Sequence, residues 1–270
     1  FTPADSGSPG RPSVWRAAEG ATPVVSGSTI LRLGWRPSPL RPGVYEADTP
    51  EGLEIDQLWV DGRPAWMARF PDRTPGPGVN VFDAWVLDHR PTRDPARDAL
   101  DPARTGGWAK PAGAHLHAMH PALWGGIHFV ITGRKPDGTL ALSGGTQNNR
   151  GSGVHSVFRF VENLLEELDA PGEWFHDRAG RKLYLFPFDG TDPRTATLEA
   201  SRTDALVVVR GSVARPVRHI EFRGLAFRHT DRTFLRTAEP LLRSDWTVHR
   251  GGALFFSGTE DVAVSDCALE

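Results

Sequence analysis

The sequence predicts an all-β protein built on a parallel β-solenoid, and a repeat in its last third carries this prediction. Residues 217–228 and 259–270 both alternate apolar or small residues with polar ones, and Gly224 and Asp266 divide each segment into two short strands. At one fixed offset, the first segment's apolar positions match those of the second: Ile220, Phe222, Leu225 and Phe227 against Val262, Val264, Cys267 and Leu269. A strand–turn–strand unit of this kind cannot bury its inward face alone, so its copies must stack.

The order of the remaining elements predicts a solenoid that is interrupted early by a large insertion. Residues 1–32 contain short strand-like runs at 14–17 and 24–27, and we expect them to form the first solenoid turns. Residues 33–194 have longer loops rich in Trp and Pro, which predicts an inserted, mainly-β subdomain. The alternating pattern returns in residues 195–270, and we expect the solenoid turns to continue past the last residue.

Three hairpins and one helix are predicted inside the insertion. The hairpin turns are marked by Asp61-Gly62, Pro136-Asp137-Gly138 and Arg178-Ala179-Gly180, each between two strand-like runs. Residues 158–168 carry apolar side chains at helical spacing, and Pro171-Gly172 ends the pattern. The acids Glu166, Glu167 and Asp169 are interpreted as the solvated face of this helix.

Composition excludes several classes of partner. The 270 residues carry 31 basic and 33 acidic side chains, for a formal net charge of −2, and no basic patch stands out. The sequence therefore predicts no nucleic acid partner. No apolar run is long enough to cross a bilayer, so no membrane insertion is predicted. The single cysteine, Cys267, cannot form an internal disulfide and is expected to pack inward as a small hydrophobe.

Several long stretches resemble bacterial right-handed parallel β-helix proteins. The resemblance is carried by residues 160–174, which end in Ala170-Pro171-Gly172-Glu173-Trp174, and by residues 181–187, 239–246 and 250–253. Within that pectate-lyase-like superfamily, the chain is similar to the β-helix glycoside hydrolases that include α-L-fucosidases and xylanases. The resemblance implies a right-handed coil, a polysaccharide or oligosaccharide substrate, and a secreted or periplasmic location. A shared fold supports an activity by analogy.

The function predicted from these features is glycoside hydrolysis of a plant or microbial polysaccharide. This reaction uses two carboxyl groups, one as acid and the other as nucleophile or base. By resemblance, the catalytic carboxylates are expected on middle solenoid turns, which would lie beyond residue 270. The alternatives are a polysaccharide lyase and a non-catalytic glycan-binding or adhesion protein. The sequence shows no dense Asp cluster that could bind the calcium ion many lyases use, which argues against the lyase. No cofactor is predicted, and the oligomeric state stays open.

Within the chain, the best carboxylate candidates are Glu239 and Asp245. Both lie on residues 229–251, a long loop between two solenoid turns, which also holds the predicted substrate-binding residues His229, Arg243 and Trp246. Loops that leave a rigid scaffold are natural places for a site. We expect the insertion to form one wall of the cleft. The structural alternative is that Asp245 pairs with Arg243 or Arg250 and fixes the loop.

A second candidate cluster consists of His115, His117, His120 and Trp124. On a strand, His115 and His117 would share a face, and His120 could fold back toward them. Three histidines can bind zinc, but no Cys, Asp or Glu at a matching spacing supports a metal, so none is predicted. We predict that His117, His120 and Trp124 contact a sugar, with packing as the alternative. Asn149 and Arg150 lie in a polar loop whose groups could read sugar hydroxyls, or form a plain surface turn.

The nine tryptophans divide into two predicted groups. Those beside polar residues in loops are candidates for stacking on sugar rings: Trp85, Trp108, Trp124 and Trp246. Those in strand-like alternation are expected in the core: Trp15, Trp59 and Trp66.

Overall fold

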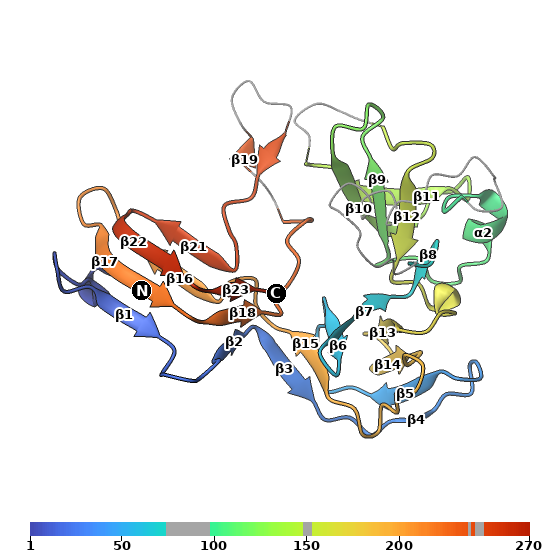
Figure 1. The fold of residues 1–270 in the computed structure, drawn as a ribbon. Coiled ribbons are helices and arrows are strands. Elements are labelled where there is room, and N and C mark those ends of the chain that lie inside the picture. Colours follow the sequence, from blue (N-terminus) through green and yellow to red (C-terminus); the bar gives the residue numbers. More distant parts are fainter. Residues whose placement is uncertain (74–97, 148–152, 237–238, 241–245) are drawn as a thin grey trace.

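The computed structural model describes residues 1–73, 98–147, 153–236, 239–240 and 246–270, and their regular secondary structure is almost entirely β (Figure 1). Small parallel sheets lie at one end and larger, mainly antiparallel sheets at the other. The regular helices in the described residues are short: the 3₁₀ turns η1 (Pro3–Asp5) and η3 (Leu165–Glu167) and the α-helix α2 (Pro102–Gly106). In these residues no helix has the length and apolar character needed to cross a membrane.

Three small parallel sheets lie at one end of the molecule, and two of them join strands from the two ends of the chain. They are β1 (Ser13–Arg16)–β17 (Val217–Arg223)–β22 (Thr259–Ser265), β2 (Val24–Ser26)–β18 (Ala226–Arg228)–β23 (Ala268–Leu269), and β16 (Val207–Arg210)–β21 (Leu254–Ser257). Ile220 pairs with Val262 and Phe222 with Val264, as the repeat predicts. The predicted parallel pairing of these two segments is therefore confirmed.

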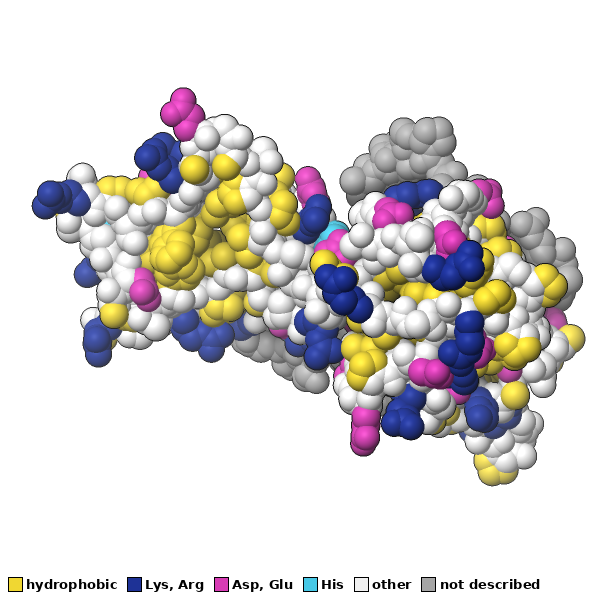
Figure 2. Space-filling view, turned by 90° about the horizontal axis from the view of Figure 1, so that it is seen from below, with side chains coloured by type: hydrophobic (Ala, Val, Ile, Leu, Met, Phe, Trp, Pro, Cys, Tyr) yellow, Lys and Arg dark blue, Asp and Glu magenta, His cyan; other side chains and the backbone are white. Residues whose placement is uncertain are grey.

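The parallel sheets enclose a core made from one face of each strand. Val209, Val217 and Phe222 are buried together, and Cys267 packs against them as predicted. Trp15 is 51% exposed and touches Phe1 edge-on, so its predicted core position is wrong. Figure 2 shows hydrophobic side chains gathered at the surface of this end of the molecule.

An eight-stranded sheet adjoins the parallel sheets. Its order is β3 (Ser28–Leu31), β15 (Leu198–Ser201), β6 (Leu58–Val60), β7 (Arg63–Met67), β13 (Glu173–Asp177), β14 (Lys182–Leu185), β5 (Tyr45–Asp48), β4 (Arg36–Pro37). Two predicted hairpins, β6–β7 and β13–β14, lie within it and are confirmed. The β6–β7 turn needs positive φ at both central residues, which Asp61 (49°) and Gly62 (75°) adopt. Trp59 is buried here, as predicted.

A five-stranded antiparallel sheet completes the fold. Its order is β11 (Leu140–Gly144), β10 (Gly126–Arg134), β9 (His115–Met119), β12 (Arg159–Glu162), β8 (Arg69–Phe70). The predicted β10–β11 hairpin is confirmed. β9 is flanked on both sides, and Leu116 and Ala118 in it are fully buried.

The predicted helix at residues 158–168 is wrong. Residues 159–162 form β12, because β9 and β8 supply hydrogen-bonding partners on its two edges. Asn163 then turns the chain with a φ of 65°, which an α-helix does not allow. The predicted solvated face is also wrong at Glu167, which is 4% exposed and accepts a hydrogen bond from Trp108 Nε1 at 2.7 Å.

Candidate functional site

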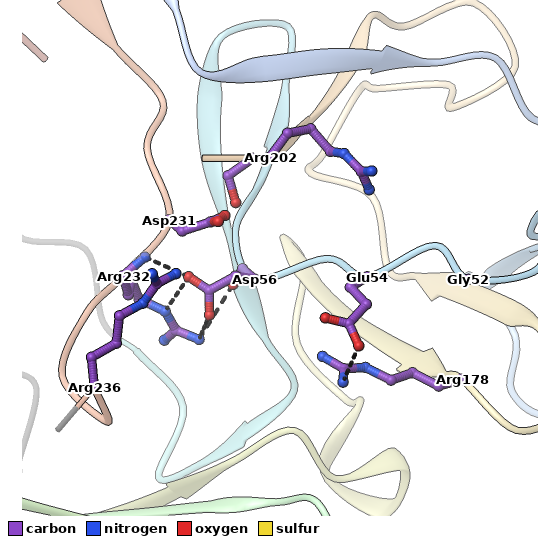
Figure 3. A pocket seen from close by; sticks show the side chains of 9 residues that line it. Gly52, Glu54, Asp56, Arg178, Arg202, Asp231, Arg232 and Arg236 are labelled. Carbon is purple, nitrogen blue, oxygen red and sulfur yellow. Dashed lines mark hydrogen bonds and ion pairs between the residues drawn. The ribbon is translucent and has the colours of Figure 1, made fainter. Parts of the chain in front are cut away.

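The segment after β18 carries the chain from the parallel sheets onto the antiparallel ones. Arg232 links the parallel sheets to the antiparallel sheets. Its backbone N–H donates to Asp56 Oδ2 at 2.6 Å, and its guanidinium reaches Asp56 Oδ1 at 3.2 Å (Figure 3). Further along, Phe234 O accepts a hydrogen bond from Gln147 Nε2 at 2.7 Å. This segment is therefore fixed at several points against the predicted insertion.

A pocket of about 430 Å³ lies beside this contact (Figure 3). Its lining is strongly polar and comes from both parts of the molecule: Gly52, Glu54, Asp56, Arg178, Ser201, Arg202, Asp231, Arg232 and Arg236. The residues from 52–56 and Arg178 belong to the predicted insertion, and those from 231–236 belong to the predicted loop between solenoid turns. The pocket is therefore lined by residues from both segments.

Most charges of the pocket are paired within the protein. Arg178 lies 3.3 Å from Glu54 Oε1, and Arg236 lies 2.7 Å from Asp204 Oδ2. In the part of the chain that the structure describes, the side chains of Arg202 and Asp231 have no ion pair or hydrogen bond. These two side chains are the groups of the pocket best able to bind a polar ligand.

Behind Arg232 lies a buried carboxylate, Glu162, which is 6% exposed. Its Oε1 accepts hydrogen bonds from Arg232 Nη1 at 2.6 Å and His117 Nε2 at 3.1 Å, and His115 Nδ1 lies 3.6 Å away. Burial raises the pKa of Glu162, but the positive charge of Arg232 and the contacts with the two histidines outweigh it. The pKa of this carboxyl group therefore lies well below its ordinary value, and Glu162 stays ionised.

His117 continues this cluster to the neighbouring strand. Its Nδ1 lies 2.7 Å from Nδ1 of His128, which is its cross-strand partner on β10. Phe160 stacks on the His117 ring at 4.5 Å, and Phe234 lies 4.8 Å away. This apolar enclosure lowers the pKa of His117, because burial disfavours the imidazolium more than Glu162 favours it. His117 is therefore neutral near pH 7.

The spacing of His115, His117 and Glu162 raises the question of a metal. One ligand atom from each lies within 4.8 Å of the others, which resembles a three-ligand site. However, the Arg232 guanidinium lies 2.6 Å from Glu162 Oε1, the same carboxylate oxygen that contacts His117 and lies 3.6 Å from His115. Arg232 thus supplies the positive charge at this position, and the group fits an ion-pair cluster better than a metal centre.

Three of the predicted sugar-contacting residues come together on the surface. His120 and Trp124 stack at 4.9 Å with planes 5° apart, and Trp246 lies edge-on to His120 at 6.2 Å. The Trp124 side chain is 62% exposed. Next to Trp246, Thr247 donates from its N–H to Gln147 O at 3.1 Å, which holds the returning loop against the five-stranded sheet.

Two further predicted site residues, His117 and His229, are buried and do not share this exposed surface. His117 is buried in the Glu162 cluster, and His229 is 5% exposed and stacks on Trp59 at 4.0 Å. Glu239 belongs to β19 (Glu239–Pro240), which pairs with β20 (Thr247–Val248). The predicted residues Asn149, Arg150, Arg243 and Asp245, and also Trp85, lie outside the described residues.

Trp108 does not have the predicted stacking role. It is 2% exposed, and its indole N–H donates to Glu167. Sequence reasoning also missed Asp56, His128 and Glu162 as parts of the central cluster. Before Glu162, the neighbouring apolar residues Phe160 and Val161 are compatible with a buried strand. The helical spacing of the apolar residues in 158–168 favoured the helix prediction instead.

Comparison with known proteins identifies a structural neighbour. A solved structure titled "Glycoside hydrolase" matches with a TM-score of 0.71 and 20% sequence identity, covering 99% of this chain and 51% of that chain. Another, titled "The complex structure of XylC with xylose", has a TM-score of 0.30 and 12% identity, covering 83% of this chain and 27% of that one, which is too low to support an argument. No family model and no curated protein matches the chain. The chain therefore has a glycoside hydrolase-like fold and spans about half the length of that neighbour.

Proposed function

We propose that this chain is part of a carbohydrate-active protein, a glycoside hydrolase of the right-handed parallel β-helix type that acts on a plant or microbial polysaccharide. The observation that carries the proposal is the fold match over 99% of the chain. The three parallel sheets with in-register stacking support the β-helix. Under this proposal, residues 1–32 and 195–270 are β-helix turns, residues 33–194 are an insertion, and the protein is secreted or periplasmic.

The polar pocket supports a sugar ligand. Its volume of about 430 Å³ lies within the usual range for small-molecule sites. A carboxylate can accept two hydroxyl hydrogens, and a guanidinium can donate to hydroxyl and ring oxygens. Asp231 and Arg202 supply one such group each. The exposed ring of Trp124 supplies an apolar face of the kind that packs on a sugar ring.

The chemistry of hydrolysis requires two carboxyl groups on either side of the glycosidic bond. Asp231 joins the predicted Glu239 and Asp245 as a candidate on the loop between parallel strands. Asp56 is a poorer candidate because its oxygens already accept hydrogen bonds from Arg232. Carboxylates on further β-helix turns, beyond residue 270, remain part of the proposal.

The test is to incubate the full-length protein with a panel of plant and microbial glycans and to measure released reducing sugar. Release of reducing ends without ultraviolet absorbance supports hydrolysis, whereas unsaturated products would show a lyase. Binding without turnover would show a non-catalytic glycan-binding protein, and neither binding nor turnover would overturn the proposal.

The pocket itself is tested with Asp231→Asn in the same protein. We expect at least a ~10-fold rise in the dissociation constant for the active glycan, the equivalent of about 1.4 kcal/mol. The matched control is Glu260→Gln. Glu260 is an exposed acid on β22 that pairs with Arg218 on β17, and neither residue lines the pocket. Equal affinity in both variants would remove the pocket from the sugar site.

A further inference from the structure

The pocket between the two parts of the molecule has an unequal supply of donors and acceptors. Its charged lining consists of four arginines and three acids: Arg178, Arg202, Arg232 and Arg236 against Glu54, Asp56 and Asp231. These side chains differ in how far the protein already uses their hydrogen-bonding groups. The groups that the protein leaves unused are the ones that a ligand would meet.

Three of the arginines keep unused N–H donors. A guanidinium has N–H groups on Nε, Nη1 and Nη2, and among the described residues Arg178 uses Nη1 alone, which donates to Glu54 Oε1 at 3.3 Å. Arg236 likewise uses Nη1, which donates to Asp204 Oδ2 at 2.7 Å. The side chain of Arg202 makes no hydrogen bond or ion pair within the described ranges.

The acids of the pocket offer fewer unused acceptors. Both carboxylate oxygens of Asp56 accept from Arg232, one from its backbone N–H at 2.6 Å and the other from its guanidinium at 3.2 Å. Glu54 has one oxygen in contact with Arg178. In the part of the chain that the structure describes, Asp231 is the one lining acid whose carboxylate has no partner. Positively charged donors therefore dominate the unused hydrogen-bonding groups of the pocket.

The backbone holds Arg202 and Asp231 in place. Arg202 N donates to Gly27 O and Asp231 N donates to Thr203 O, both at 2.8 Å. In Figure 3 the guanidinium of Arg202 and the carboxylate of Asp231 lie on different sides of the view, and no interaction joins them. A ligand between them would meet a positive donor on one side and an acceptor on the other, without an ion pair to break.

We propose that this pocket selects a sugar that carries an acidic group, a carboxylate or a sulfate, and that Arg202 determines this preference. An anionic group of this kind accepts several N–H bonds at once, and a guanidinium can bind it through two parallel hydrogen bonds. Asp231 accepts from the hydroxyl groups of the same sugar. The identification of the ligand as a sugar rests on the proposed function, whereas the preference for an anion rests on the groups of the pocket.

The test compares acidic sugars with their neutral parents in NMR titrations of the protein, which detect weak binding. The probes are glucuronate with glucose, galacturonate with galactose, and mannuronate with mannose, together with sulfate esters of the same neutral sugars. We expect at least one acidic sugar to bind ~10-fold or more tightly than its neutral parent. The uronate and sulfate series show which anion is preferred. If every neutral parent binds as tightly as its acidic forms, or if no sugar binds, the proposal is overturned.

Arg202→Gln tests the residue that determines the preference. The Arg202 side chain is exposed and has no hydrogen bond or ion pair to lose among the described residues, so the variant should fold normally. We expect its affinity for the preferred acidic sugar to fall ~10-fold, to that of the neutral parent, whose own affinity should change less than ~2-fold. Arg202→Lys should recover part of the loss, because Lys supplies a point charge without the paired donors.

The matched control is Arg218→Gln. Arg218 is an exposed arginine on β17 that pairs with Glu260 and does not line the pocket, so both affinities should stay unchanged. An Arg202→Gln protein that keeps its preference for the acidic sugar would refute the role of Arg202.

This inference and the proposed function fail in different ways. Hydrolysis of neutral glycans without any preference for acidic sugars would keep the proposed function and overturn the inference. A preference for acidic sugars that depends on Arg202, with no reducing sugar released from any glycan, would keep the inference and overturn the proposed hydrolysis.

Discussion

Arg232→Ala should be one of the most destabilising single substitutions in this protein, because it leaves a buried carboxylate without its cation. Arg232 bonds both Glu162 and Asp56, and Glu162 is 6% exposed. Removing one partner of a buried ion pair costs about 3–5 kcal/mol. A quarter of the Arg232 side chain is exposed, which places the expected loss near the lower end, about 3 kcal/mol at pH 7.

The pH dependence of this loss identifies its cause. In the native protein the pKa of Glu162 is lowered, so its ion pairing adds stability above the unfolded-state pKa and loses it as pH falls through the folded-state pKa. In the Arg232→Ala protein, burial is no longer outweighed by Arg232 and the pKa of Glu162 rises. The cost is then present at neutral pH and shrinks as pH falls from the raised folded-state pKa toward the unfolded-state pKa of about 4.3, because the carboxyl becomes protonated in the folded protein.

Urea denaturation followed by tryptophan fluorescence at pH 7 and pH 4.5 measures this difference. Arg178→Ala is the control, because Arg178 and Glu54 form an exposed pair that is expected to contribute about 0–1 kcal/mol. Combining Arg232→Ala with Glu162→Gln should recover part of the loss. A loss below about 1 kcal/mol, or the same loss at both pH values, would refute the reasoning.

Three further predictions concern the core, the buried histidines and the exposed aromatic group. Phe222→Ala should cost about 3–5 kcal/mol in urea denaturation, because Phe222 is 3% exposed between the parallel sheets, whereas Leu269→Ala, at 64% exposure, should change stability by about 0.5 kcal/mol or less; similar losses would contradict the assigned core. Burial lowers the pKa of His117 in the folded protein. The free energy of unfolding should therefore be highest above the unfolded-state pKa of about 6.5 and should fall at lower pH, where the unfolded chain binds a proton that folded His117 does not. His117→Gln should flatten that dependence between pH 7 and 5, and an unaltered slope would rule His117 out as its source. Trp124→Ala should weaken glycan binding about 3–10-fold in titration calorimetry without lowering the melting temperature. The control Trp15→Ala removes an exposed tryptophan of the parallel sheets and should leave the glycan affinity unchanged. An equal loss of affinity in both variants would contradict a specific sugar contact at Trp124.

Local patterns were sufficient to predict the parallel strands and the hairpins. The fixed offset between Ile220 and Val262 reflects a real strand pairing, because stacked strands place equivalent side chains on one face. Asp61 and Gly62 predicted their hairpin because few residues tolerate positive φ at both turn positions. In each case the residues that predict the element belong to the strand or turn that they form.

The central cluster could not be predicted in the same way. Arg232 and Glu162 are 70 residues apart, and nothing in either segment indicates the other. The apolar spacing around residue 160 suits a helix, but β8 and β9 offered hydrogen bonds on both edges and a strand formed. Tertiary partners thus decided the local structure, and that strand carries Glu162 to His117.

The parallel sheets also determine when this protein can fold during its synthesis. β1 pairs with β17, so Ser13 meets Ile220 across about 200 residues of intervening chain. At roughly 5–20 residues per second, on the order of 10–40 s pass between synthesis of the two strands. During this interval β1 lacks its native partner, and Val14 and Trp15 are open to mispairing. A chaperone that binds the emerging N-terminal strands should therefore raise the yield of folded protein.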